Sequence, residues 1–240
     1  MAGDPSTSPP APYPEGEGEN EPFKPLSFRR GVGVRSDRRL LQVVDGALAE
    51  ANRLAATPQG SWLACRPGCT DCCHGPFPIN RLDALRLRRG LAELAARAPE
   101  RARALADRAE AQLPLLRQDF PGDARTGVLS DDDQAADPFF TRHGDLPCPV
   151  LDPDTGRCEL YAYRPLTCRT FGPPVRIGEA DLPPCRLCFQ GASKETVDAC
   201  RVEPDPHGLE DRLLARLGDE ETLIAFAVAS PPQPRSRSPR

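Results

Sequence analysis

Aromatic side chains are scarce in this sequence: they make up 5% of its 240 residues, with a single Trp. Hydrophobic residues together reach 39%, so a core has to be built from Leu, Ala and Val with little aromatic mass. This length suits one good-sized domain, or one domain with tails.

Long apolar runs and a basic surplus are also missing. No stretch approaches the roughly 20 apolar residues that a membrane-spanning helix needs, and the first residues carry neither a basic nor an apolar region, so we expect no signal peptide. The net charge is −4, whereas nucleic-acid-binding proteins usually show a positive surplus. We therefore expect a cytoplasmic protein with no membrane or nucleic-acid partner.

Histidine is rare as well, and the familiar catalytic motifs are absent: there is no Walker-type loop, no Gly-x-Ser-x-Gly and no His-Glu-x-x-His. His74 adjoins Cys73, but adjacent side chains seldom aim at each other, which disfavours a Cys–His catalytic pair. For His74 the residues leave open a further ligand, a residue supporting a ligand, or a plain surface histidine.

Cysteine, by contrast, is abundant, with ten residues. Four of them fall within the short stretch from Cys65 to Cys73, where Pro67-Gly68 predicts a turn. Thiolates are soft ligands that select zinc, Cu(I) or iron–sulfur centres. Because the cytosol keeps thiols reduced, metal ligands are the first interpretation, redox thiols the second and structural disulfides the last. The candidate metal ligands are Cys65, Cys69, Cys72, Cys73, Cys148, Cys158, Cys168, Cys185 and Cys188.

The later cysteines lie on recognisable local structures. Two short apolar runs around Asp152–Gly156 predict a β-hairpin that carries Cys148 and Cys158, with its register left open. Pro165 can begin a short helix that presents Cys168. Cys185 and Cys188 form a Cys-x-x-Cys knuckle, a spacing that lets two thiolates reach one metal.

The fold class that we predict is mainly α: a small helical domain with one β-hairpin around a cysteine-rich metal site. Residues 1–35 and 231–240 are expected to be disordered tails, the second one basic, because they are rich in Pro, Ser and Gly or Arg without an apolar period. Residues 36–230 form the metal-binding domain. Apolar periodicity predicts helices at about 37–56, 80–98, 99–116, 209–217 and 220–229, and a surface loop over 119–146. We expect the helices at 80–98 and 99–116 to form an antiparallel hairpin, and the last helix to pack on the first.

The cysteine pattern resembles the YkgJ-type cysteine-cluster family of zinc- or iron-chelating domains. The resemblance rests on Cys-x-x-x-Cys-x-x-Cys-Cys at residues 65–73, on Cys148, on Gly156-Arg157-Cys158, and on Arg164-Pro165-Leu166-Thr167-Cys168-Arg169, so it covers about residues 60–190. It implies metal chelation by the matched cysteines. One branch, the flagellin lysine N-methylases, is similar in cysteine pattern and implies an iron–sulfur-linked methyl transfer. We expect this chain not to share the longer C-terminal region of those proteins, so their activity is not carried over to it.

Several chemistries remain open for the site. A structural zinc site uses four ligands, so nine thiols suit two mononuclear sites, or one iron–sulfur cluster with extra thiols. The first spacing also matches radical SAM enzymes, but no Gly-rich strand or βα repeat follows. We therefore predict a metal-chelating protein with iron–sulfur or zinc. The alternatives are an iron–sulfur redox or methyl-transfer enzyme and a thiol-redox sensor. Cys200 lies outside the matched stretch and is either a ligand or a buried free thiol.

Overall fold

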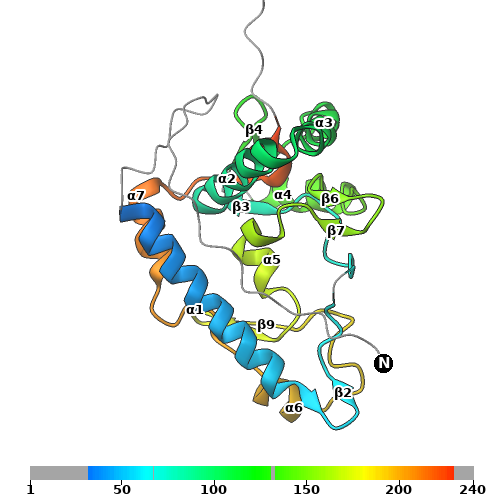
Figure 1. Cartoon of the computed structure of the whole chain (residues 1–240), viewed down its shortest axis with the longest axis vertical. Coiled ribbons are helices and arrows are strands. Elements are labelled where there is room, and N and C mark those ends of the chain that lie inside the picture. The colour runs from blue at the N-terminus through cyan, green and yellow to red at the C-terminus, as the bar shows by residue number, and fades with distance from the viewer. Residues whose placement is uncertain (1–31, 67, 131–132, 230–240) are drawn as a thin grey trace, which may run out of the picture.

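The computed structural model describes residues 32–66, 68–130 and 133–229. Helices form the larger part of the regular structure (Figure 1), in keeping with a mainly α protein. The helices are α1 Val32–Leu54, α2 Arg81–Arg97, α3 Pro99–Leu116, α4 Asp133–Arg142, α5 Leu166–Thr170, α6 Lys194–Ala199, α7 Leu209–Leu217 and α8 Ile224–Val228, with one 3-10 turn at Tyr161–Tyr163.

The strands are only two or three residues long, and in the described part of the chain they form five two-stranded antiparallel sheets rather than one hairpin. The hairpin that the sequence predicts is β6–β7, in which Leu151 lies opposite Cys158. The pairs are β1 Ala56–Thr57 with β2 Gly60–Ser61, β3 Pro78–Asn80 with β10 Glu221–Leu223, β4 Gly122–Asp123 with β5 Val128–Leu129, β6 Leu151–Asp152 with β7 Arg157–Cys158, and β8 Val175–Ile177 with β9 Ala180–Leu182.

The long helix α1 runs along one side of the molecule (Figure 1). Its apolar period buries Leu41 and Val44 as predicted, and Leu213 of α7 packs in the same cluster. Because α1 begins at Val32, residues 32–35 are helical rather than part of the predicted tail. The remainder of both predicted tails lies outside the described residues. None of the described helices is long and apolar enough to cross a membrane.

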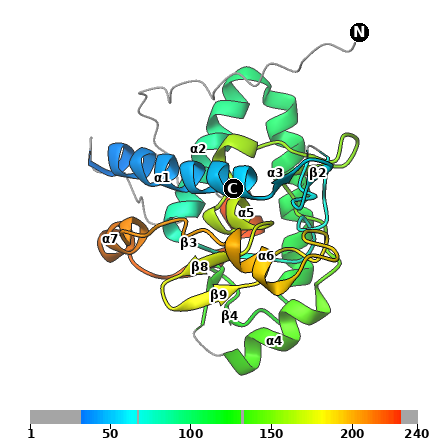
Figure 2. The same cartoon turned by 90° about the horizontal axis from the view of Figure 1, so that it is seen from below.

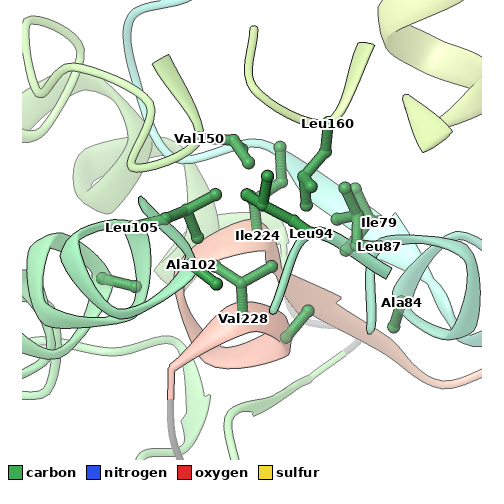
Figure 3. Packing of buried hydrophobic residues seen from close by; sticks show 12 residues of the cluster. Ile79, Ala84, Leu87, Leu94, Ala102, Leu105, Val150, Leu160, Ile224 and Val228 are labelled. Atoms are coloured by element: carbon green, nitrogen blue, oxygen red, sulfur yellow. The ribbon is translucent and has the colours of Figure 1, made fainter. Parts of the chain in front are cut away.

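The main core lies where α2 and α3 form the predicted helical hairpin. Asn80 caps α2 by accepting a hydrogen bond from the backbone N–H of Asp83, at 3.0 Å, and Pro99 is the first residue of α3. Figure 3 shows Leu94 and Leu105 of these helices converging with Val150, Leu160, Ile224 and Val228. The residues that follow Cys148 and Cys158 are thus anchored in this core.

The C-terminal segment differs from the sequence prediction of one helix over 220–229 packed on the first helix. Residues 221–223 form β10, which pairs with β3, and only Ile224–Val228 are helical. Ile224 and Val228 pack against α2 and α3 instead of α1 (Figure 3). Residues 221–223 form a strand because β3 supplies backbone hydrogen-bond partners for them. The helix propensity of this segment alone does not include such distant partners.

The segment 119–146 is also more ordered than the surface loop that we predicted. It forms β4, β5 and α4, and the Phe120 ring meets the rings of Phe139 and Phe226 with centroid distances of 5.8 and 5.0 Å. These rings form a second core cluster, to which α8 contributes Phe226. Three of the nine Phe residues of the chain thus meet in this cluster.

A buried ion network joins α1, α2 and α5. Sequence periodicity places Arg86 on the wet face of α2 and Asp37 at the start of the first helix, but both are buried, and the Arg86 Nε donates to Asp37 Oδ1 at 2.7 Å. Arg86 also pairs with Asp83, which is 1% exposed. The Asp83 carboxylate accepts the backbone N–H of Leu166 at 3.1 Å and so fixes the start of α5.

Replacing Arg86→Met should lower the free energy of unfolding by about 3–5 kcal/mol, because it leaves two carboxylates buried without a cation. Urea unfolding followed by circular dichroism measures this. Arg53→Met is the matched control: Arg53 pairs with Glu50 on the exposed face of α1, and its loss should leave the free energy of unfolding almost unchanged. Equal effects of the two substitutions would contradict a structural role for the network.

Candidate metal centre

The stretch from Cys65 to Cys73 folds as two consecutive tight turns. The N–H of Cys69 donates to the Arg66 carbonyl at 2.9 Å, and the N–H of Cys73 donates to the Thr70 carbonyl at 2.8 Å. Gly68 has φ +87°, a backbone conformation that side chains other than glycine adopt at a cost. The turns separate the thiols of this stretch, so the first and last cysteines face different parts of the molecule.

The end of this stretch pairs with the segment before β6. The N–H of Gly75 donates to the Leu146 carbonyl at 2.7 Å, and the N–H of Cys148 donates to the Cys73 carbonyl at 2.8 Å. This short antiparallel pairing brings Cys73 beside Cys148, although they are far apart in sequence.

Cys73 belongs to a first group of four thiols, which we call the inner set. Cys148, Cys158 and Cys168 all pack against the main core, and all three lie within electrostatic reach of the Cys73 thiol. Cys168 stands on α5, as predicted, where Asp83 holds the helix start. The register of the hairpin, which the sequence leaves open, does not decide the position of Cys148, because Cys148 precedes β6. Cys148 lies in a turn closed by a hydrogen bond from the Leu151 N–H to the Cys148 carbonyl. The inner set is Cys73, Cys148, Cys158 and Cys168.

A second group, the outer set, forms around Cys65. The Cys65 and Cys188 sulfurs are 4.0 Å apart, and Cys185 and Cys69 also act electrostatically on Cys65. The N–H of Ala64 donates to the Cys188 sulfur at 3.4 Å, and the N–H of Cys185 donates to the Gly172 carbonyl at 3.0 Å. The outer set is Cys65, Cys69, Cys185 and Cys188.

An apolar wall supports the Cys185–Cys188 knuckle. The Trp62 and Phe189 rings stack with centroids 6.4 Å apart and planes within 11°. Both rings belong to a small cluster with Cys188 and Cys200, separate from the main core. In Figure 1 the neighbouring α6 and β2 lie at one end of the molecule and α3 and β4 at the other; Figure 2 views the molecule from below, the α6 end.

Two cysteines fall outside both sets. Cys72 interacts with Cys73, with Cys185 and with Cys168, and therefore lies between the sets. Cys200 is 4% exposed, and burial alone raises its pKa, which fits the buried free thiol rather than a ligand. All ten cysteines are free of disulfides.

Burial keeps most of these thiols protonated in the metal-free chain. It raises the pKa of Cys65, of Cys148 and of Cys168 to about 12 each, and neighbouring cysteine charges add to the effect. Backbone N–H groups of Val150 and Leu151 act in the opposite direction at Cys148. A hydrogen bond from Cys72 lowers the pKa of Cys73 despite burial.

One arginine acts on the inner set. The Arg164 guanidinium lowers the pKa of Cys158 and Cys168 against the larger effect of burial, and it lies 3.8 Å from the centroid of the Tyr161 ring. Arg169 pairs with Asp45 and Arg186 with Asp71. Among the arginines that the sequence places beside cysteines, Arg164 thus has a marked electrostatic effect on this set.

The donor groups fit a soft metal ion. Each set offers four thiols, the number that closes a tetrahedral site, and a cation would relieve the repulsion between the thiolates of a set. Within residues 32–66, 68–130 and 133–229, no three Cys, His, Asp or Glu side chains are already close enough together to hold an ion. Binding therefore requires the thiols of a set to rotate or move toward one another.

Some residues of the site escape a reading of the sequence alone. Gly172 has φ +130°, and a Cβ there would lie 2.8 Å from the Cys65 sulfur, so glycine makes room for the outer set. Asp83, in the first turn of α2, positions the Cys168 helix by accepting the backbone N–H of Leu166. The glycine could have been suspected from Phe171-Gly172-Pro173, a turn sequence directly after the Cys168 helix. Asp83 follows the helix cap Asn80 by three residues, but nothing in the local sequence connects it to the Cys168 helix.

Fold and site together define a small, mainly helical protein with cysteine donor groups suited to a soft metal. A family model described as "CxxCxxCC: Putative zinc- or iron-chelating domain" matches residues 64–186, slightly more than half of the chain. The chain belongs to this family, and membership supports metal binding in general. The matched range ends two residues before Cys188. No curated protein and no solved structure matches the chain.

Gly172→Ala should weaken metal binding at the outer set, because the added methyl group meets the Cys65 sulfur and the backbone has positive φ. Gly178→Ala is a matched control: it also has positive φ (+58°), but nothing lies within 4 Å of the new Cβ. Zinc titration against a competing chelator should show a weakened site only for Gly172→Ala. Equal affinities in both variants would contradict the packing of Cys65 on Gly172.

The metal-free protein should lose stability as the pH rises above about 9. Unfolded thiols ionise near 9.0, whereas Cys148 and Cys168 titrate at about 12 in the folded chain, so alkaline conditions favour the unfolded state. Their contribution is fully present below 9 and declines between about 9 and 12. Urea unfolding of metal-free protein under reductant at pH 7.5 and 9.5 measures this, and the Cys148→Ser variant should show a smaller decline.

Proposed function

We propose that this protein chelates two metal ions, one in the inner set and one in the outer set. The observation that carries the proposal is the division of eight thiols into two groups of four, each drawn from two or more distant segments. Four thiolates close a tetrahedral site without a further ligand. Nine thiols competing for a single ion would leave most of them unused.

The spacing of sulfurs in the outer set favours a mononuclear ion. With a metal–sulfur distance of about 2.3 Å, the edge of a tetrahedral thiolate site is about 3.8 Å. The Cys65–Cys188 separation of 4.0 Å is close to this value. In a [4Fe–4S] cluster each thiolate binds a different iron, which sets the sulfurs further apart. Zinc is the ion we propose, with mononuclear iron as the other ion that suits the same four thiolates.

A role for the metals in folding follows from the segments that they would join. The inner set ties the Cys73 turn, β7 and α5 together over the main core. The outer set ties residue 65 to the knuckle at 185–188 across the small Trp62 cluster. We propose a structural and chelating role in the cytosol, where reductants maintain the ten free thiols.

Elemental analysis of anaerobically purified protein tests the proposal. We expect two equivalents of zinc, or of iron without acid-labile sulfide. Cys65→Ser and Cys158→Ser should each remove one equivalent, and the double variant both, whereas Cys200→Ser should retain two. Circular dichroism of each variant checks that the fold survives.

Other outcomes would overturn the proposal in recognisable ways. Equal amounts of iron and acid-labile sulfide in a coloured protein would indicate an iron–sulfur cluster instead of mononuclear sites. This result would favour a redox or methyl-transfer enzyme. Fresh protein without metal whose thiols form reversible disulfides would make it a thiol-redox sensor. Loss of both equivalents in either single variant would mean one shared centre.

A further inference from the structure

The two sets differ in their access to solvent. Cys148, Cys158 and Cys168 of the inner set are partly buried, and all three pack against the main core. In the outer set Cys188 is buried, and the Cys65 sulfur is partly desolvated beside it, but the Cys65 residue as a whole is exposed. Cys69 lines a surface hollow of about 610 Å³. A ligand from solution can therefore approach the outer set without disturbing the core.

The hollow is polar and carries groups that bind metals. Its lining includes Cys69, Asp71, His74, Asp145, Arg186 and Leu187. Asp71 is paired with Arg186, and its Oδ2 is 3.9 Å from the Cys185 sulfur. The pair neutralises the guanidinium, so the hollow does not favour an anion, and it orients one ligand of the outer set.

His74 presents a metal-binding nitrogen in this hollow. Its Nδ1 lies 3.1 Å from the Thr70 carbonyl oxygen. A carbonyl can only accept, so Nδ1 carries the proton and the neutral ring has its lone pair on Nε2. A neutral imidazole can bind zinc through the ring nitrogen that carries the lone pair, which here is Nε2. The side chain is exposed, so it can turn between solvent and the site.

We propose that the outer set is an exchange site for a divalent metal, with His74 as a transient ligand. The metal enters and leaves through this hollow, while the inner set releases its ion much more slowly. The inference rests on the proposed binding of two ions. During release, an imidazole–metal bond would form as the Cys69 thiolate–metal bond breaks. Donor atoms of the accepting chelator would then replace the imidazole and the three remaining thiolates, and the freed thiolates would take protons from water, leaving hydroxide. No electron is transferred.

The test is the release of zinc from the fully loaded protein to a chromophoric chelator, 4-(2-pyridylazo)resorcinol, in stopped flow. We expect two phases of one equivalent each, with the first faster by roughly tenfold or more. Cys69→Ser should abolish the fast phase and Cys158→Ser the slow one. His74→Asn should slow the fast phase by roughly tenfold at unchanged amplitude, because losing a residue that assists a metal typically has effects of this size.

The controls separate this inference from the proposed function. Asparagine retains a donor for the Thr70 carbonyl, so His74→Asn changes only the Nε2 ligand, and His207→Asn alters an exposed histidine elsewhere and should leave both phases unchanged. Two equivalents released at one rate, a fast phase that survives in Cys69→Ser, or wild-type kinetics in His74→Asn would overturn the exchange site while leaving two-ion binding intact. If the protein binds only one equivalent of zinc, the measured stoichiometry contradicts the proposed binding of two ions before any release kinetics are considered.

Discussion

Thiolates of one charge must be held together in this molecule, and the rest of the structure depends on how that repulsion is contained. In the metal-free chain burial retains protons on Cys65, Cys148 and Cys168, which lowers the charge but also opposes metal binding. A cation bound to a set would displace those protons and convert repulsion into attraction. Folding, protonation and metal binding are therefore linked in one equilibrium.

Short backbone pairings, rather than long strands, decide which thiols meet. The pairing of Cys73 with Cys148 and the hydrogen bond from Cys185 to Gly172 close long loops with only one or two bonds each. Loop closure costs conformational entropy that so few bonds offset poorly. The buried Asp37–Arg86–Asp83 network and the small core clusters supply the remaining stabilisation, and a bound ion in each set would add cross-links where the pairing is shortest.

Much of the fold follows from the sequence wherever a segment signals its own structure. The bounds of α3 and α7 agree with the apolar period and the N-terminal proline, and the short helix at Cys168 follows from Pro165. The strand β10 and the burial of Arg86 did not follow, because each depends on a partner distant in sequence. The cysteine spacing likewise identified nine candidate ligands but not their division: adjacent Cys72 and Cys73 interact with different neighbours, and only the fold shows which.

The outer set shows why the limits of a family match need not be the limits of a site. The matched range begins at residue 64 and ends at residue 186, yet Cys188 accepts the Ala64 N–H and lies 4.0 Å from the Cys65 sulfur, across 123 positions of sequence. Without Cys188 the outer set would offer three thiols beside a polar hollow. With Cys188 it offers the four donors that a closed tetrahedral site would need. The Cys-x-x-Cys spacing, which places Cys185 and Cys188 on one turn closed by the Cys188 N–H, makes the second sulfur part of the same site as the first.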